Sequence, residues 1–355
     1  MSNQAALPTE AIISLTNRCD ARCTMCNIWQ LDPEEDLKAE DYRRALPNTL
    51  RNVNLTGGEA LLRPDILDIT QAIHEAASQA RIILATNGFR TEKALKTVTN
   101  LLKIVPKLGI AVSLDGSAES HDKMRGVPKA YDRAVETLRG LRKLGMQDIR
   151  IGFTATAENV HELIPIYQLA KSLDVEFTAT VAQNSEIYYS TAENSTIDPE
   201  AIAREFTALI QQRLNSSSPK DWLRGYFDRG VIHFARTGLR MTGCDAASGF
   251  FYLAWSGNIY PCLTVPKSLG NIRNQSFTEL WNSEQAVLIR QEASRCQKCW
   301  MVCTARSELK RNPLRVTNWL RRSTRKRNAS GAVYDDPRVA VGAGRVDGVG
   351  ARAEA

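Results

Sequence analysis

Short apolar segments alternate with longer segments of helical spacing through the first half of this 355-residue chain. The short segments have the length and composition of buried strands and span residues 11–15, 52–56, 81–86, 110–114, 149–154 and 175–180. The segments between them place apolar residues three and four positions apart, as an amphipathic helix requires, and span residues 66–77, 91–105, 130–144 and 160–173. This alternation is typical of parallel strands joined by helices. It predicts an α/β fold with a site at the carboxyl edge of the sheet.

Composition places the chain among ordinary globular proteins, with 43% apolar and 24% charged residues. No run of 18 apolar residues occurs, so no membrane span is predicted. Residues 1–10 lack the basic start and the apolar run of a signal peptide, which predicts a cytoplasmic protein. Thiols stay reduced in that compartment, so the eight cysteines indicate metal binding or catalysis rather than disulfides.

Three cysteines lie within eight residues directly after the first strand, at Cys19, Cys23 and Cys26. A structural zinc site takes four ligands, and no histidine nearby in the sequence completes a set of four. A four-iron cluster also takes four cysteines as a rule, so three leave one iron open to a ligand from outside the protein. A zinc knuckle and a chance grouping are the alternatives to an iron–sulfur site.

The CxxxCxxC spacing after a first strand, followed by strand–helix repeats, resembles the radical S-adenosylmethionine (SAM) superfamily. The resemblance implies a partial (β/α)6 barrel, a [4Fe-4S] cluster held by these three cysteines, and SAM bound to the open iron. It further implies reductive cleavage of SAM to a 5′-deoxyadenosyl radical, which abstracts hydrogen from the substrate. The position before Cys26 is usually aromatic in the family. Here it is Met25, whose apolar, polarizable side chain can pack against adenine.

Other strand ends carry residues that the resemblance assigns to SAM. Gly57-Gly58-Glu59 follows the second strand and matches the motif that holds the SAM amino group. Polar residues at the third and fourth strand ends are implied to contact the SAM ribose, the SAM carboxylate or the substrate: Asn87, Ser113 and Asp115. The segment from His121 to Arg125 resembles the HDxxR segment of sulfatase-maturase-like members, in which Arg125 would pair with the SAM carboxylate. Turn chemistry and a structural ion pair are the alternatives.

Five further cysteines lie in a segment with a Gly-Asn turn, a Pro-Cys pair and a Leu-Trp-Asn-Ser stretch. This order resembles the SPASM/twitch domain, which holds auxiliary iron–sulfur clusters in radical SAM enzymes. The resemblance implies one auxiliary [4Fe-4S] cluster with four ligands: Cys244, Cys262, Cys296 and Cys299. Cys303 is left over. It replaces one of these ligands, donates hydrogen as a catalytic thiol, or is an inert buried thiol. A zinc ribbon is the alternative to the cluster.

The predicted organisation has five parts. They are an N-terminal extension (1–10), a radical SAM core (11–215), a linker helix region (216–243), a SPASM/twitch domain (244–306) and a basic, partly disordered tail (307–355). Between Arg306 and Arg327, nine Lys or Arg residues stand against one acid, whereas the whole chain carries a net charge of +7. The body of the protein is therefore close to neutral and nucleic-acid binding is not expected of it. The basic segment is expected to be solvated or to contact an anionic partner or membrane surface.

The sequence leaves three hypotheses on function open. The first is an oxidoreductase that dehydrogenates or epimerizes a sugar, a cyclitol or another small metabolite, which the single-cluster spacing of the distal cysteines favours. A GTP cyclase is a variant of it, although that family ends in Gly-Gly. The second is a peptide or protein maturase that forms thioether or carbon–carbon crosslinks or formylglycine; Cys19 comes early for a leader-binding domain. The third is a non-catalytic zinc protein. For both enzymes the resemblance implies a flavodoxin- or ferredoxin-type electron donor.

Overall fold

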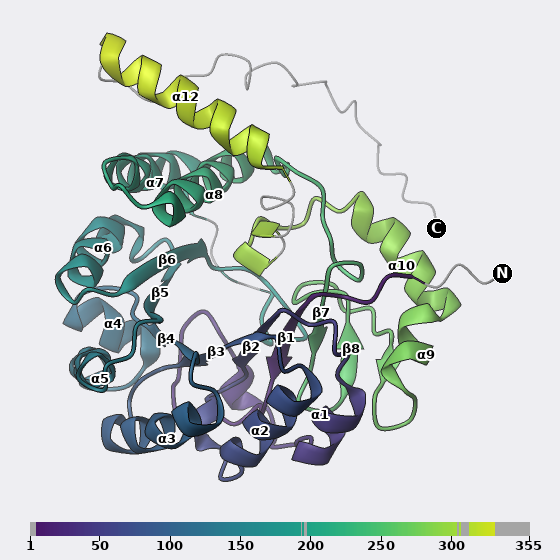
Figure 1. Ribbon diagram of the computed structural model, residues 1–355. Coiled ribbons are helices and arrows are strands. Elements are labelled where there is room, and N and C mark those ends of the chain that lie inside the picture. The colour runs from purple at the N-terminus through teal and green to yellow at the C-terminus, as the bar shows by residue number, and fades with distance from the viewer. Residues whose placement is uncertain (1–4, 193, 195–196, 304, 307–311, 331–355) are drawn as a thin grey trace, which may run out of the picture.

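The framework of the protein is a curved sheet, seen in a computed structural model that describes residues 5–192, 194, 197–303, 305–306 and 312–330 (Figure 1). Six parallel strands lie side by side in chain order: β1 (Glu10–Ser14), β2 (Asn52–Thr56), β3 (Arg81–Thr86), β4 (Gly109–Ser113), β5 (Ile149–Ala155) and β6 (Glu176–Val181). Every strand predicted from the sequence is present within one residue of its expected ends. The sheet order is linear, so the strands form a partial barrel and the predicted parallel α/β fold is confirmed.

Helices connect the strands and cover the outer face of the curved sheet (Figure 1). They are α1 (Ala39–Ala45), α2 (Ile66–Ala76), α3 (Thr91–Ile104), α4 (Ala118–Arg125), α5 (Ala130–Lys143) and α6 (Leu163–Ser172), with short 3₁₀ turns at Ile28–Gln30, Ala60–Leu62 and Val160–Glu162. The sequence did not predict α1 and α4, because their segments AEDYRRA and AESHDKMR are polar and lack an apolar repeat. Both follow a strand whose carboxyl end carries site residues.

The main core lies between the sheet and these helices. In β5 every second side chain is buried, which is the pattern expected of a strand with one face against the core. Leu138 and Leu141 of α5 are fully buried on the same core, and each such side chain contributes about 1.5–3 kcal/mol by leaving water. The helix ends at Lys143, and Gly145 follows it with a φ of 80°, the left-handed conformation expected after a helix C-terminus.

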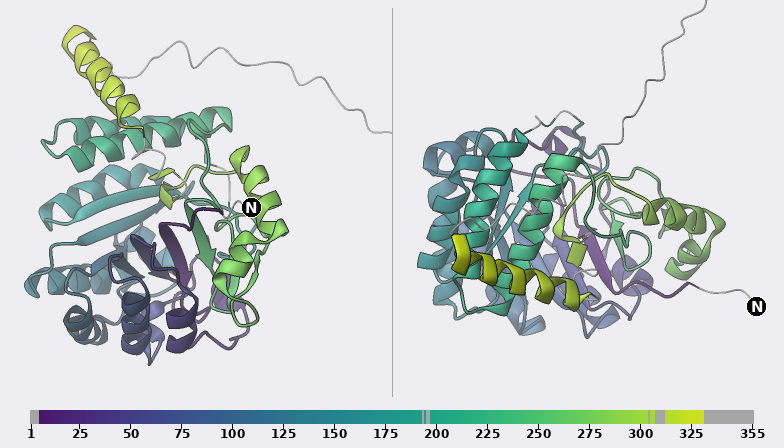
Figure 2. Two further views of the ribbon diagram at one scale, coloured as in Figure 1. Left: turned by 45° about the vertical axis from the view of Figure 1, so that its right-hand side comes forward. Right: turned by 90° about the horizontal axis from the view of Figure 1, so that it is seen from above.

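Two long helices, α7 (Pro199–Leu214) and α8 (Pro219–Thr237), follow β6, and a third helix, α12 (Pro313–Ser330), packs on α8. In α7 the Asp198 carboxylate caps the start by accepting from the amides of Glu200 and Ala201, each at 3.2 Å. Helix α12 lies beside α8, and the rings of Trp319 and Tyr226 meet edge to face at 5.5 Å (Figure 2). The expected disorder of residues 331–355 concerns positions outside the described residues.

The C-terminal cysteine segment extends the same sheet. β7 (Phe250–Leu253) pairs with β1 in parallel, and β8 (Asn258–Tyr260) and β9 (Gly270–Asn271) continue antiparallel. The expected Gly-Asn turn joins β7 to β8, with Gly257 at a φ of 92°. Helices α9 (Phe277–Asn282) and α10 (Glu284–Ser294) complete the segment. The strands on the two sides of the predicted boundary at residue 244 therefore belong to one continuous sheet. Its order is β6-β5-β4-β3-β2-β1-β7-β8-β9.

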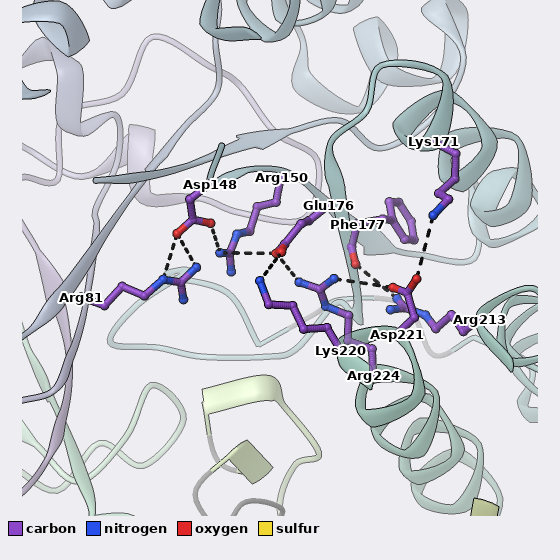
Figure 3. Close-up of polar contacts among 10 residues, drawn as sticks. All are labelled: Arg81, Asp148, Arg150, Lys171, Glu176, Phe177, Arg213, Lys220, Asp221 and Arg224. Atoms are coloured by element: carbon purple, nitrogen blue, oxygen red, sulfur yellow. Dashed lines mark hydrogen bonds and ion pairs between the residues drawn. The ribbon is translucent and has the colours of Figure 1, made fainter. Parts of the chain in front are cut away.

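A charged network closes the amino edge of the sheet, at the end of the strands away from the cysteine loop (Figure 3). The Asp148 carboxylate accepts from Arg81 at 2.9 Å and from Arg150 at 2.8 Å, across β3 and β5. Glu176, at the start of β6, accepts from Lys220 of α8 at 2.9 Å and is also held by Arg224. These contacts fix α8 against the strand starts and leave the carboxyl edge open for a site.

Candidate active site

A cavity of about 210 Å³ lies at the carboxyl edge of the sheet, where the loops after β1 to β6 converge. Its lining includes nine of the residues singled out from the sequence: Cys19, Cys23, Met25, Cys26, Gly57, Gly58, Asn87, Ser113 and Arg125. Thr86, Thr154, Tyr188 and Tyr189 line it as well. A larger open hollow of about 520 Å³ between α6 and α7 holds none of the cysteines. The structure thus brings most of the predicted site to one enclosed space.

The cysteine loop is held by backbone contacts from two sides. On one side the amide of Gly58 donates to the carbonyl of Thr16, and the amide of Glu59 donates to the carbonyl of Arg18, both at 2.8 Å. A Cβ on Gly58 would lie 2.2 Å from the Arg18 carbonyl oxygen, so only glycine allows this approach. On the other side the Arg22 amide donates to the carbonyl of Arg125 at 2.8 Å. The glycine pair therefore positions the cysteines as well as leaving its own backbone uncovered.

The three thiols of this loop are close neighbours in a largely buried setting. Cys23 is 9% exposed, and Cys19 and Cys26 are partly buried. Burial, with a further contribution from the charge of Cys23, raises the pKa of Cys19 to about 12 and the pKa of Cys26 to about 11. Both thiols therefore keep their protons at neutral pH unless a metal ion binds the sulfurs and displaces those protons.

Glu59 and Asp115 do not line the cavity, although the resemblance assigns both to ligand contacts. The Glu59 carboxylate is 3% exposed and accepts from the amides of Leu61 and Asn87 and from the Thr86 hydroxyl, at 2.7–3.0 Å. Burial raises the pKa of Glu59 to about 7. Its oxygens thus hold the end of β3 in place, and Asn87 itself presents its amide to the Asp20 carboxylate at 2.7 Å.

Asp115 is fully buried and organises the end of β4. One carboxylate oxygen accepts from the Thr154 amide at 2.8 Å, and the other accepts from Nε of Arg125 at 2.7 Å. Its own amide donates to Nδ1 of His121 at 3.0 Å. Burial, with the nearby Arg125 charge, lowers the pKa of His121 to about 2, so this imidazole is neutral. Within the predicted HDxxR segment, His121 is therefore buried and does not line the cavity, whereas Arg125 does.

A segment after β6 lies between the cysteine loop and the distal cysteines. The Tyr189 carbonyl accepts from the Asn27 amide at 2.7 Å, and the Ser185 hydroxyl donates to the carbonyl of Leu263 beside Cys262. The Tyr188 hydroxyl lies 2.6 Å from the Thr56 hydroxyl, and its ring meets that of Tyr189 edge to face at 4.5 Å. We call Tyr188 and Tyr189 the tyrosine pair.

Four of the five distal cysteines pack in one apolar cluster: Cys244, Cys262, Cys299 and Cys303. Cys19, Cys26 and Tyr188 pack against the same cluster, so it separates the two cysteine groups. Cys296 lies outside the cluster, but its charge acts on Cys244, whose pKa is raised by burial and by the neighbouring thiols. Burial raises the pKa of Cys303 well above its usual range, and its charge acts on both residues of the tyrosine pair. Cys303 thus packs against the same cluster as Tyr188, but it does not line the cavity.

The described side chains form no group of three His, Cys, Asp or Glu close enough to surround a single metal ion. A four-iron cluster distributes its thiolates over separate iron atoms, so its ligands lie farther apart than the ligands of one zinc ion.

Sequence reasoning missed several residues of the site. Asp20 lies inside the CxxxCxxC motif and holds Asn87, and its position between the cysteines was a usable signal. The tyrosine pair follows the last parallel strand, and two adjacent aromatic residues in such a loop were a second signal. Thr86 and Thr154 carry no distinguishing pattern, because threonine is common in strands.

Two family models match the chain. The radical SAM superfamily matches residues 13–170, and the SPASM iron–sulfur cluster-binding domain matches residues 244–300. The chain belongs to the radical SAM superfamily and carries a C-terminal SPASM domain, as the resemblance implied. It is therefore a radical SAM enzyme whose cofactors are SAM and iron–sulfur clusters. These matches do not support the hypothesis of a non-catalytic zinc protein.

Curated relatives include heme synthases and a bacteriocin biosynthesis protein. The AdoMet-dependent heme synthase of Methanosarcina barkeri is 29% identical over 293 residues, which cover 76% of this chain and 81% of the relative. The subtilosin biosynthesis protein AlbA of Bacillus subtilis is 24% identical over 296 residues, which cover 79% of this chain and 61% of the relative.

Solved structures support the fold. SuiB of Streptococcus suis bound to S-adenosylmethionine has a TM-score of 0.63 at 18% identity, covering 84% of this chain and 73% of SuiB. The AdoMet-bound anSMEcpe has a TM-score of 0.61 at 18% identity, covering 82% of this chain and 86% of that protein. In the described part of the chain, no helix is both long enough and apolar enough to cross a membrane.

Proposed function

We propose that the chain is a radical SAM oxidoreductase that acts on a small metabolite at the carboxyl-edge cavity. The observation that carries the proposal is the convergence of three thiols, the glycine pair and the tyrosine pair on one enclosed space. Groups from several strand ends meet there, as is usual for sites of parallel α/β folds.

The residues present fit a three-cysteine cluster and SAM. Cys19, Cys23 and Cys26 supply three buried or partly buried thiols on one loop, and backbone hydrogen bonds hold that loop from both sides. When bound, the cluster and SAM supply hydrogen-atom abstraction, and an auxiliary cluster supplies one-electron redox chemistry. The proposed role of the loop is to hold three sulfurs toward the cavity and to keep them from water.

The cavity wall around these thiols would bind SAM. We assign its amino group to the carbonyls of Gly57 and Gly58 and its polar groups to Asn87 and Ser113. Met25 is 7% exposed and packs beside Phe89, which leaves its side chain as an apolar surface for adenine. Glu59 and Asp115 act as positioning residues, because their carboxylates already accept hydrogen bonds from other groups of the protein.

The distal cysteines fit an auxiliary cluster, with Cys244, Cys262, Cys296 and Cys299 as its ligands. Cys303 packs against the same apolar cluster as Tyr188, so we assign it to hydrogen or electron exchange on the substrate side. The domain limits proposed are 11–215 for the core, 216–243 for the linker helix region and 244–306 for the distal domain, with residues 1–10 and 307–355 as flanking extensions. Electrons would come from a flavodoxin- or ferredoxin-type protein in the cytoplasm.

A small metabolite is the favoured substrate class. Three curated relatives are named as AdoMet-dependent heme synthases, at 29%, 24% and 23% identity. A further relative is an Fe-coproporphyrin III synthase, at 24% identity over 80% of its length. Sugars and cyclitols remain members of the proposed class, together with tetrapyrroles. The reaction proposed is a two-electron oxidation in which the substrate would lose a hydrogen atom, then a proton and a second electron. SAM would supply the acceptor of the hydrogen atom, and the auxiliary cluster would supply the acceptor of the electron.

A peptide substrate is the second candidate function. It is favoured by AlbA and by the sporulation killing factor maturation protein SkfB of Bacillus subtilis, which is 21% identical over 303 residues. The first test must therefore include both substrate classes.

The test has two stages on the full chain. After anaerobic reconstitution we expect about eight irons per chain, falling to about four when Cys19, Cys23 and Cys26 are all changed to Ala. Release of 5′-deoxyadenosine under a strong reductant is then measured with sugars, cyclitols, tetrapyrroles and peptides. A rise with a small metabolite supports the proposal, and a rise with peptides alone overturns the substrate class. Unchanged iron in the triple variant overturns the assignment of the three cysteines.

A further inference from the structure

The guanidinium of Arg125 reaches the sulfur of one cluster cysteine. Nη1 of Arg125 donates to Sγ of Cys23 at 3.7 Å, and both residues are no more than 9% exposed. Nε and Nη2 of the same guanidinium bind the carboxylate of Asp115, which is fully buried. The guanidinium therefore lies between the Asp115 carboxylate and the Cys23 sulfur, and its Nη1 group faces the sulfur.

The position of this guanidinium is set by the surrounding structure. Asp115 accepts from the Thr154 amide and its carbonyl accepts from Asn159 at 2.6 Å, so the carboxylate cannot follow a moving arginine. Gly126, directly after Arg125, lies against the Arg22 backbone; a Cβ there would be 2.7 Å from the Arg22 carbonyl oxygen. Helix α4 and the cysteine loop are thus held together on both sides of the contact.

Because His121 is neutral, Arg125 carries the positive charge among the three buried residues His121, Asp115 and Arg125. A buried cation that donates to a thiolate stabilises negative charge on that sulfur more than water would. In iron–sulfur proteins the reduction potential depends on hydrogen bonds to the sulfurs and on nearby charge. Reduction adds negative charge, so such a donor favours the reduced cluster.

We propose that Arg125 is a positioning residue that raises the reduction potential of the three-cysteine cluster through its hydrogen bond to Cys23. The inference rests on the proposed role of Cys23 as a ligand and goes beyond the role of Arg125 as a partner of the SAM carboxylate. Three of the five N–H groups of the guanidinium are already committed to Asp115 and Cys23. The effect is therefore present before SAM binds.

The experiment is a redox titration of the full chain, without SAM, followed by electron paramagnetic resonance. The signal of the three-cysteine cluster is identified as the one that is lost in Cys26→Ala. For Arg125→Met we expect a more negative midpoint potential, with the reduced-to-oxidised ratio at fixed potential falling about tenfold, which is about 59 mV for one electron. Arg125→Lys should lie between Arg125→Met and the wild type, because it keeps the charge and loses the fork geometry.

Arg90→Met is the matched control, because it also removes a positive charge beside the cysteine loop. Arg90 donates to Asp20 at 2.8 Å, is about half exposed, and is not seen to donate to a cysteine sulfur among the described contacts. Its midpoint potential should equal the wild-type value.

Three outcomes overturn the inference. The first is a wild-type midpoint in an iron-loaded Arg125→Met protein. The second applies if Arg125→Met does not load iron. Equal midpoint potentials for Arg125→Lys and Arg125→Gln would then show that the charge at this position does not affect the potential. The third is loss of iron in all three Arg125 variants with normal loading of Arg90→Met, which makes Arg125 a structural requirement of the loop. If instead Cys26→Ala keeps every signal, the proposed assignment of the cluster ligands fails, and the role of Arg125 fails with it.

Discussion

At Gly58 one missing methyl group decides how closely two loops approach. The position is enclosed by backbone atoms of Asn17 and Arg18, which cannot move aside as a flexible side chain would. Gly57 is similar, since a Cβ there would lie 2.5 Å from the Thr16 carbonyl oxygen at a φ of 140°. The two glycines of the motif therefore have a packing role that is independent of any ligand.

We predict that Gly58→Ala destabilises the protein by about 1–3 kcal/mol, because the added methyl group overpacks a backbone contact. The same change should lower the iron bound at the cysteine loop, since that loop must shift. Urea unfolding and iron content measure the two effects. Gly152→Ala is the control: nothing lies within 4 Å of its added Cβ, and alanine in a strand is favoured over glycine by about 0.5–1 kcal/mol. Equal behaviour of the two variants would contradict the prediction.

At the scale of elements, the charged network at the amino edge joins β3, β5 and β6 to α8. Glu176 is its centre, with a side chain that is 22% exposed and pairs with Arg150, Lys220 and Arg224. Burial alone would raise the pKa of Glu176, but these three cations lower it to about 2. Charge at this edge supports the fold, and the candidate site lies at the opposite edge.

Glu176→Gln should therefore lower the free energy of unfolding by about 2 kcal/mol, less than the pKa shift alone implies, because solvent screens a partly exposed group. The folded-state pKa is depressed, so the stabilisation is complete above pH 4.5 and declines as pH falls toward 2. Urea unfolding should show a constant difference from pH 7 to 5 and a narrowing one below pH 4.5.

The matched control for this change is Glu158→Gln, whose carboxylate pairs with Lys123 at the surface and is 54% exposed. Its effect should stay within about 0.5 kcal/mol at every pH. A loss for Glu176→Gln that grows as the pH falls would contradict the sign of the argument.

At the scale of the whole molecule, the two matched domains share one sheet and one core. β7 of the distal domain is paired to β1, and Phe251 and Leu253 belong to the same apolar cluster as Ile13. Without β7, the β1 edge would expose unpaired backbone groups and apolar side chains. The two cysteine groups are therefore carried on a continuous framework and keep a constant relation to each other.

We predict that β1 and β7 open in one cooperative step. Native-state hydrogen exchange should give the amides of Ile13 and Leu253 the same opening free energy and the same dependence on denaturant. The amides of α12 are the control, since that helix packs on α8 at the periphery and should open at lower free energy. Earlier opening of β7 than of β1 would show that the distal domain unfolds separately.

Local patterns predicted the six parallel strands because apolar periodicity is carried by neighbouring residues. They did not predict α1 or α4, whose polar segments are helical only in their tertiary setting. The CxxxCxxC spacing indicated the cysteine site because three thiols on one short loop must lie close together. The orientations of the Glu59 and Asp115 side chains could not be predicted, since their partners come from other strand ends and from the end of α4: Thr86, Asn87, Thr154 and Arg125.

The sequence by itself determined the six parallel strands, the three-cysteine loop and the presence of a second cysteine group, because each depends on spacing along the chain. Only the tertiary structure decided which groups face the cavity, that β7 joins the sheet beside β1, and that Arg125 reaches the sulfur of Cys23. These contacts join residues about 100 to 240 positions apart. Their energies arise from burial and from hydrogen bonds that exist only once the separate strands have assembled.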